Sequence, residues 1–121
     1  MGRYYSGDID GKFMFGIQPS DAPERFHAVD LGNSGIYGET EYYIGYDYRH
    51  KVKKEVESID KGSLERVNKM YNENDMFTED TMKIYGVTTN DLREYADHRL
   101  GMQILEHFKE NKCDCYIYAE L

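Results

Sequence analysis

Four acidic residues are the first candidates for chemistry in this sequence. Asp8, Asp10, Glu39 and Glu41 come together if the first and third predicted strands are neighbours, and paired carboxylates can bind a cation or divide acid and base roles. The segment Asp8–Gly11 has only a fragment of a calcium-binding loop, because it lacks the third oxygen ligand and the distal glutamate. We therefore predict neither a metal ion nor a cofactor.

The thiols and imidazoles do not have the spacing of a catalytic or metal centre. Cys113 and Cys115 are separated by one residue, so in a strand they point to opposite faces and do not form a disulfide with each other. This usage is consistent with a reducing cytoplasm. His98 and His107 lie too far apart on one predicted helix to chelate as an i, i+4 pair. A spatial pair of Cys115 with His98, and a small hydrolase using Asp8 or His98, stay as alternatives.

Tyrosine and negative charge dominate the composition. The chain has 12 tyrosines, no tryptophan and a formal net charge of −8. Tyrosine is enriched where proteins bind each other, while strong negative charge repels nucleic acid and membrane phosphates. Tyrosines occur at both parities of the predicted strands, so we expect them on a buried and on a wet face of one sheet. These features predict a non-catalytic binding protein that contacts neither nucleic acid nor a membrane directly.

The leading hypothesis is that the protein binds a basic surface of another protein. Residues 55–82 hold eight acids and three bases. In its strong form, the hypothesis is that these carboxylates imitate a phosphate track and attract the basic groove of an enzyme that binds nucleic acid. The candidate protein-binding residues are Glu55, Glu57, Glu73, Asp75, Glu79 and Asp80.

The alternative is a protein that binds a small ligand, such as a nucleotide or a cyclic nucleotide. A basic cluster around residues 49–54 could hold phosphate, and tyrosine rings could stack on a base. The candidate ligand-binding residues are Tyr5, Tyr42, Tyr43, Arg49, Lys51 and Lys53.

The elements expected to position these residues form an α+β domain. A chain of 121 residues can build one core, so we predict a single domain over residues 1–121. Strand signals occur in an N-terminal hairpin, Arg3–Gln18, and at 41–48 and 113–119. They predict an antiparallel sheet of about four strands, packed on one face by three or four helices. A sheet covered with tyrosine also favours a homodimer.

The hairpin register follows from its turn. A three-residue loop, Ile9–Gly11, keeps apolar side chains on one face, and it pairs Phe13 with Gly7 and Phe15 with Tyr5. The segment 32–35 is expected to be a flexible loop.

Helical spacing begins after residue 48. Gly62 either ends the first helix, with Ser63 capping a second one, or lies inside one long helix. Thr78 is predicted to cap a short helix, and Thr88 or Thr89 to cap the last one.

The opening sequence, GRYYSGDIDGKFMF, with Gln18 and Ser20–Asp21 after it, resembles the start of small uncharacterised proteins of phages and large DNA viruses. The resemblance covers residues 1–25. It implies a viral protein that acts in the host cytoplasm by binding and inhibiting host machinery, for example a defence enzyme that binds nucleic acid.

Overall fold

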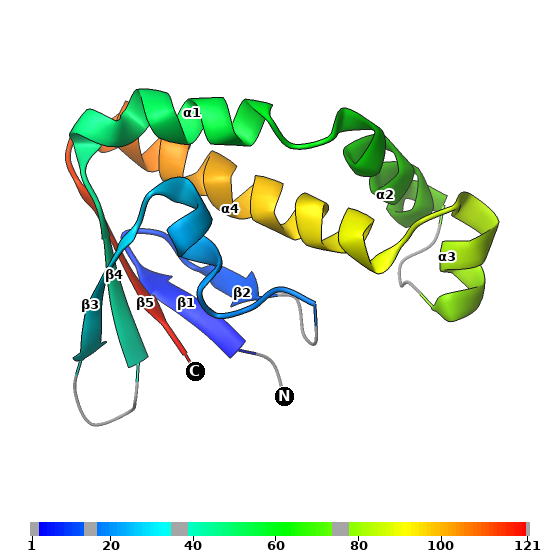
Figure 1. The fold of residues 1–121 in the computed structure, drawn as a ribbon, viewed down its shortest axis with the longest axis horizontal. Coiled ribbons are helices and arrows are strands. Elements are labelled where there is room, and N and C mark those ends of the chain that lie inside the picture. Colours follow the sequence, from blue (N-terminus) through cyan, green and yellow to red (C-terminus); the bar gives the residue numbers. More distant parts are fainter. Residues whose placement is uncertain (1–2, 14–16, 35–38, 74–77, 121) are drawn as a thin grey trace.

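The computed structural model of the chain describes residues 3–13, 17–34, 39–73 and 78–120. Within them the chain forms an α+β fold with a five-stranded antiparallel sheet (Figure 1). The strands are β1 (Arg3–Gly7), β2 (Gly11–Phe13), β3 (Val29–Ser34), β4 (Glu39–Ile44) and β5 (Cys115–Ala119). The helices are α1 (Arg49–Glu57), α2 (Lys61–Glu73), α3 (Glu79–Tyr85) and α4 (Thr89–Asn111), with 3₁₀ turns η1 (Ala22–Phe26) and η2 (Tyr46–Tyr48). The predicted fold class is confirmed, with one more strand than expected.

The strand order explains which residues of the sheet can meet. The order is β2-β1-β5-β4-β3, and each neighbouring pair is antiparallel. The C-terminal strand therefore lies between the N-terminal hairpin and β4. The same position of β5 separates β1 from β4, so Asp8 and Asp10 do not converge with Glu39 and Glu41 as expected.

Two strand boundaries differ from the prediction. The strand expected at 41–48 ends at Ile44, and Tyr46–Tyr48 is a 3₁₀ turn that leads into α1. A flexible loop was expected at 32–35, but residues 32–34 belong to the strand β3. The sequence pattern did not indicate this strand, because Gly32 interrupts it. Gly32 has a φ of +93°, and the β3–β4 register shifts between Asp30 and Gly32.

The predicted register of the N-terminal hairpin is wrong. Tyr5 pairs with Gly11, whereas a three-residue loop requires Phe13 opposite Gly7, and Phe15 lies outside the described residues. A Cβ at Gly11 would collide with the Tyr5 ring, so the ring fits over this position because glycine has no side chain. Gly7 pairs with β5 instead.

Two clusters of buried side chains lie along one long helix. The larger cluster fills the space between the sheet, α1 and the C-terminal half of α4, and it includes Phe13, Phe26, Ile44, Val52, Leu100, Ile104 and Ile117. The smaller cluster joins α2 to the N-terminal part of α4 through Val67, Met70, Val87 and Leu92. Figure 1 shows α2 and α3 extending beyond the sheet. In the described part of the chain, no helix is both long and apolar enough to cross a membrane.

The helical segment after residue 48 is two helices. The break precedes Gly62, and the Asp60 carboxylate accepts hydrogen bonds from the Gly62 N–H at 3.0 Å and the Ser63 hydroxyl at 3.2 Å. Asp60 thus caps α2, the role expected for Ser63. Thr78 and Thr88 cap α3 and α4 as predicted, and each accepts a hydrogen bond from a backbone N–H three residues later.

Candidate functional site

One face of the sheet is covered by helices, and the other face is open (Figure 1). In β4, Tyr42 and Ile44 are buried under the helices, and Tyr43 between them points to the opposite side. In β5, Ile117 is buried while Tyr116 is 39% exposed. Strand alternation therefore separates the tyrosines into a buried set and an exposed set, as the sequence predicts.

We call the uncovered surface the open face. Tyr118 lies opposite Glu41, and Tyr116 lies opposite Tyr43, so their side chains are neighbours. The described side chains of the open face are Tyr4, Ser6, Lys12, Val29, Glu39, Glu41, Tyr43, Tyr116, Tyr118 and Glu120. Tyrosines from β1, β4 and β5 thus form one aromatic surface across the middle of the sheet.

Hydrogen bonds hold the tyrosine hydroxyls beside carboxylates. The Tyr43 hydroxyl donates to Asp114 at 3.0 Å, and the rings of Tyr43 and Tyr116 are 5.2 Å apart between centroids. The hydrogen bond with Asp114 raises the pKa of Tyr43, and the charge of Glu41 raises the pKa of Tyr118. These phenols therefore stay neutral at neutral pH and keep their O–H donors.

The open face is acidic as well as aromatic. Glu39, Glu41 and Glu120 lie among its tyrosines, and Lys12 is the base in the set defined above. The Lys12 ammonium lies 5.8 Å from the centre of the Tyr4 ring, which is the arrangement of a cation–π contact. A surface with these groups can accept further lysine or arginine side chains on its rings and carboxylates.

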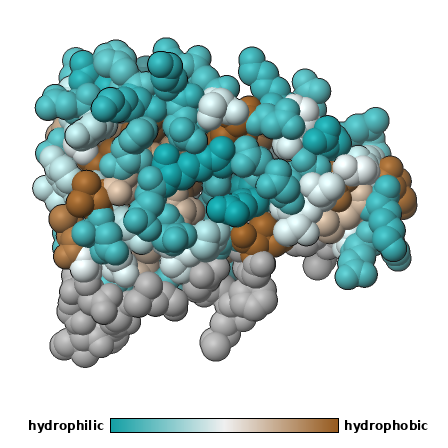
Figure 2. Space-filling view, in the orientation of Figure 1, coloured by the Kyte–Doolittle hydropathy of each residue, from teal (hydrophilic) through white to brown (hydrophobic). Residues whose placement is uncertain are grey.

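Apolar side chains extend the open face at one edge. Val29 of β3 lies opposite Tyr43 and is 53% exposed, and Leu31 on the same strand is also exposed. Figure 2 shows mostly hydrophilic side chains over the helical layer, with apolar atoms at the β3 edge and at the α3 end. Ile84 is the exposed apolar residue of α3. The β3 edge therefore adds apolar contact area beside the tyrosines.

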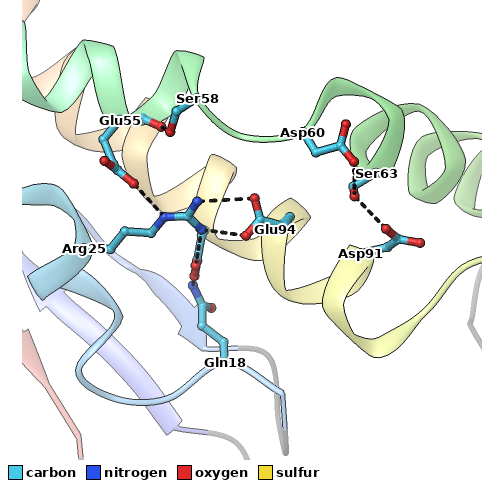
Figure 3. Close-up of polar contacts among 9 residues, drawn as sticks. Gln18, Arg25, Glu55, Ser58, Asp60, Ser63, Asp91 and Glu94 are labelled. Atoms are coloured by element: carbon cyan, nitrogen blue, oxygen red, sulfur yellow. Dashed lines mark hydrogen bonds and ion pairs between the residues drawn. The ribbon is translucent and has the colours of Figure 1, made fainter.

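One predicted protein-binding residue, Glu55, belongs to an internal ion-pair network (Figure 3). The Arg25 guanidinium lies 3.1 Å from Glu55, 2.9 Å from Glu94 and 2.9 Å from Asp97. Gln18 donates a further hydrogen bond to Asp97 at 2.9 Å. Burial disfavours the charged form of Arg25, but the hydrogen bonds that it donates to these carboxylates outweigh that effect and raise its pKa. Glu55 thus connects α1 with η1 and α4.

The other predicted protein-binding acids lie on separate helices. Glu57 is exposed on α1, while Glu79 and Asp80 are exposed at the start of α3. Figure 1 shows α1 and α3 at opposite ends of the helical layer. Glu73 of α2 accepts a hydrogen bond from a tyrosine of α3, and Asp75 lies outside the described residues. The described members of the set therefore do not form one continuous acidic track.

The tyrosines predicted to bind a ligand do not converge. Tyr42 is buried under the helices, and burial raises its pKa to about 12. Tyr43 lies on the other face, so the two rings cannot stack on one ligand. Tyr5 is also buried, and its hydroxyl donates to Gln103 at 2.5 Å.

The basic residues predicted to hold phosphate lie on α1 and contact its neighbouring turn. The Arg49 guanidinium is 4.3 Å from the centre of the Tyr46 ring, and the Lys51 ammonium is 4.9 Å from that of Tyr48. Lys53 is exposed. These contacts place the cations against η2 rather than against the ligand-binding tyrosines of the prediction.

A separate cavity of about 490 Å³ lies between the N-terminal hairpin and α4. Its lining includes the aromatic residues Tyr5, Phe13 and Tyr95 and the basic residues Lys12 and Arg99. Sequence reasoning missed all of these except Tyr5, because α4 and the hairpin are far apart in the sequence.

The histidine beside Cys115 is His107 rather than His98. Ligand atoms of Asp8, His107 and Cys115 all lie within 4.8 Å of one another. Cys115 is fully buried, and burial raises the pKa of its thiol to about 12, which disfavours it as a nucleophile. The considered pair of Cys115 with His98 is therefore wrong. Sequence spacing could not show the actual pair, because His107 lies on α4 and Cys115 on β5, and only the fold places them together.

Comparison of this chain with family models, with curated proteins and with solved structures finds no match. The resemblance of residues 1–25 to viral proteins thus stays a prediction, and the site itself must support any function.

Proposed function

We propose that this protein is a non-catalytic binding protein whose open face docks on a lysine- and arginine-rich surface of a partner protein. The observation that carries this proposal is the group of tyrosines on the open face, set among Glu39, Glu41 and Glu120. Tyrosine is among the residues that contribute most to the affinity of protein interfaces. The carboxylates favour a partner of opposite charge.

The charge of the open face distinguishes between possible occupants. Two copies of this chain joined through their open faces would bring carboxylates against carboxylates, which costs free energy. The net charge of −8 likewise disfavours nucleic acid and anionic lipid. A basic protein surface is the occupant that both the aromatic and the acidic groups suit.

Binding of this kind blocks or sequesters the partner. A basic surface that normally holds nucleic acid becomes inaccessible when an acidic protein covers it, and the opposite charges accelerate the encounter. This proposal retains the inhibitor hypothesis but moves the contact from the helical acids to the open face. A viral protein that inhibits a host defence enzyme would act in this way.

The proposal can be tested by NMR with a defined probe. A ¹⁵N-labelled sample is titrated with a synthetic peptide rich in lysine, arginine and aromatic residues, and with a charge-reversed peptide as control. We expect saturable shift changes at the open-face positions of β1, β4 and β5 that weaken as salt is added. Shift changes confined to α1 and α3, or none with the basic peptide, would contradict docking through the open face.

The cavity beside the hairpin favours a second candidate function, the binding of a small anionic ligand with an aromatic ring, such as a nucleotide. Its volume lies within the usual range of ligand sites. Binding of a nucleotide panel is followed by thermal shift for the unmodified protein, Arg99→Glu and Arg93→Glu. Arg93 is exposed on the same helix but does not line the cavity. Selective loss with Arg99→Glu supports the cavity, and equal behaviour of both variants excludes it.

A further inference from the structure

Three side chains with metal-binding atoms converge where β1, β5 and α4 meet. Asp8 follows β1, His107 lies on α4 and Cys115 begins β5. One oxygen, nitrogen or sulfur atom of each lies within 4.8 Å of those of the other two. Cys113, just before β5, has a second thiol beside His107, since its Sγ is 3.7 Å from His107 Nε2, but it does not belong to the cluster of three.

The distances are close to those of a tetrahedral zinc site. Zinc bonds of about 2.0–2.3 Å place neighbouring ligand atoms roughly 3.5 Å apart. His107 Nε2 is 3.8 Å from Asp8 Oδ2 and 3.7 Å from Cys113 Sγ. The Cys115 sulfur lies within 4.8 Å of the ligand atoms of Asp8 and His107. It must therefore move toward them by roughly 1.3 Å at most to reach the spacing of a zinc site. Rotations of the His107 and Cys113 side chains are required as well, since Nε2 contacts the Asp114 carbonyl oxygen and Cys113 lies outside the cluster.

The backbone fixes Asp8 at this place before any ion binds. Gly7 has a φ of +107°, and a Cβ there would lie 2.6 Å from the Tyr116 carbonyl oxygen. Because Gly7 allows this turn, the Asp8 N–H donates to the Tyr116 carbonyl at 2.9 Å. The Tyr116 N–H in turn donates to Asp8 Oδ2 at 2.8 Å. These two hydrogen bonds therefore hold Asp8 beside β5.

An ion can reach the cluster from solvent. A cleft of about 240 Å³ is lined by Asp8 and His107, together with Glu106 and Glu110 of α4. The two glutamates add negative charge along the approach, which attracts a cation. Cys115 forms the closed side of the site, because its side chain is fully buried.

The imidazole must turn away from the Asp114 carbonyl oxygen and change its tautomer to bind a metal. His107 Nε2 lies 2.9 Å from the Asp114 carbonyl oxygen and Nδ1 lies 3.1 Å from the Asn111 side-chain nitrogen, so Nε2 carries the hydrogen in the metal-free protein. When Nε2 binds the ion, that proton moves to Nδ1, and the Asn111 amide turns so that its oxygen accepts it. Each thiol that binds loses one proton to solvent.

We propose that Asp8, His107 and Cys115, with Cys113 as the fourth ligand, bind a zinc-class divalent ion. Thiolate and imidazole ligands favour zinc over magnesium or calcium. The proposal departs from the expectation of no metal that the sequence spacing suggested. It is independent of docking through the open face, because it rests on a different group of residues.

The experiment is a titration of metal-free, phosphine-reduced full-length protein with Co²⁺, which gives zinc-like sites a visible spectrum. We expect one Co²⁺ per chain, tetrahedral d–d bands and a thiolate-to-cobalt charge-transfer band, all lost when Zn²⁺ is added. Asp8→Asn is expected to weaken Co²⁺ binding at least about tenfold, and Cys113→Ser to reduce the charge-transfer intensity. Asp10→Asn is the matched control, since Asp10 lines the same cleft but lies outside the cluster.

Two results would overturn the proposal. One is the absence of a thiolate charge-transfer band at saturating Co²⁺, and the other is equal weakening by Asp8→Asn and Asp10→Asn. Asp8→Asn retains an oxygen that can accept from Tyr116, so it should fold, and circular dichroism checks this. Cys115→Ala is a second test, because it removes the buried thiol and should lower the charge-transfer intensity as Cys113→Ser does.

Discussion

Asp91 is a single residue that joins α4 to α2. Its carboxylate accepts hydrogen bonds from Ser63 at 2.6 Å, Arg66 at 2.9 Å and the Thr88 N–H at 2.9 Å, and Figure 3 shows it opposite Ser63. The hydrogen bond with Arg66, against the opposing effect of burial, holds the pKa of Asp91 well below its usual range. The folded state therefore binds a proton at Asp91 less readily than the unfolded state. This stabilisation is present above a pH of about 4 and is lost as the pH falls further.

Asp91→Asn is expected to lower the free energy of unfolding at neutral pH by about 1–2 kcal/mol, because the charged cap and the ion pair with Arg66 are lost. The deficit should shrink at about pH 3, where the unmodified protein has lost part of the same contribution. Urea denaturation at both pH values measures this, with Asp80→Asn as a control for removing an exposed carboxylate. A deficit of equal size at both pH values would show that the charge of Asp91 is not what stabilises the fold.

Arg25 is a single cation that forms ion pairs with three carboxylates. Arg25→Met is expected to destabilise the protein by about 3–5 kcal/mol, because it leaves the buried Asp97 and the half-buried Glu94 without their cation. The stability of Arg25→Lys should lie between those of the unmodified protein and Arg25→Met, because lysine keeps the charge but not the planar fork. Thermal and urea denaturation measure the series. A methionine variant as stable as the unmodified protein would mean that the network contributes no net stability.

Sequence reasoning reached some of these residues and missed others for a physical reason. The caps Thr78 and Thr88 were predictable, because an N-cap depends on residues a few positions away. The network of Arg25 was not predictable, because its partner Glu55 lies 30 positions away. The contacts of Asp91 with α2 were not predictable either, because Ser63 and Arg66 lie 28 and 25 positions away. The contact of His107 with Asp8 joins residues that are 99 positions apart. Only the fold brings those groups together.

At the scale of elements, α4 packs against α1 and η1 at Gly101. A Cβ at this position would lie 2.5 Å from a Val56 methyl group and 2.7 Å from the Phe26 ring. Both neighbours are core side chains without a flexible end. The missing side chain of Gly101 therefore allows the helix to lie against η1 and α1 over the sheet.

Gly101→Ala is expected to destabilise the protein by about 1–2 kcal/mol. Alanine favours a helix by about 1 kcal/mol over glycine, but the overlap with Val56 and Phe26 costs about 1–3 kcal/mol and forces them to shift. Gly62→Ala in the first turn of α2 is the control, since its nearest neighbours are polar side-chain ends. Denaturant midpoints compare the two, and a stabilising Gly101→Ala would show that the interface can relax without cost.

Elements were predictable where one periodicity dominated. The helices α3 and α4 and the strand β5 follow from apolar spacing and caps. The strand β3 was missed because Gly32 and its neighbours resemble a loop, and the hairpin register was wrong because Tyr5 lies over Gly11 rather than opposite a phenylalanine. Local pattern could not reveal either, since both depend on neighbours across the sheet.

At the scale of the whole molecule, the helices cover one sheet face and leave the tyrosines of the other exposed (Figure 1). The sequence predicted such a face from the parity of its tyrosines, but it assigned the acidic contact to helices that lie apart. The net charge of −8 directs the molecule toward basic surfaces, and the open face supplies the contact groups.

The most direct test of docking through the open face compares three immobilised forms of the protein in one cell extract at low salt. Glu41→Lys changes the open face and Glu79→Lys changes α3, and both alter the net charge equally. We expect the unmodified protein and Glu79→Lys to retain the same basic partner, Glu41→Lys to lose it at least about tenfold, and added salt to release it. Quantitative mass spectrometry of the retained proteins gives the result. Loss of the partner with Glu79→Lys but not with Glu41→Lys would contradict docking through the open face. It would instead place the interface at the acidic residues of the helices.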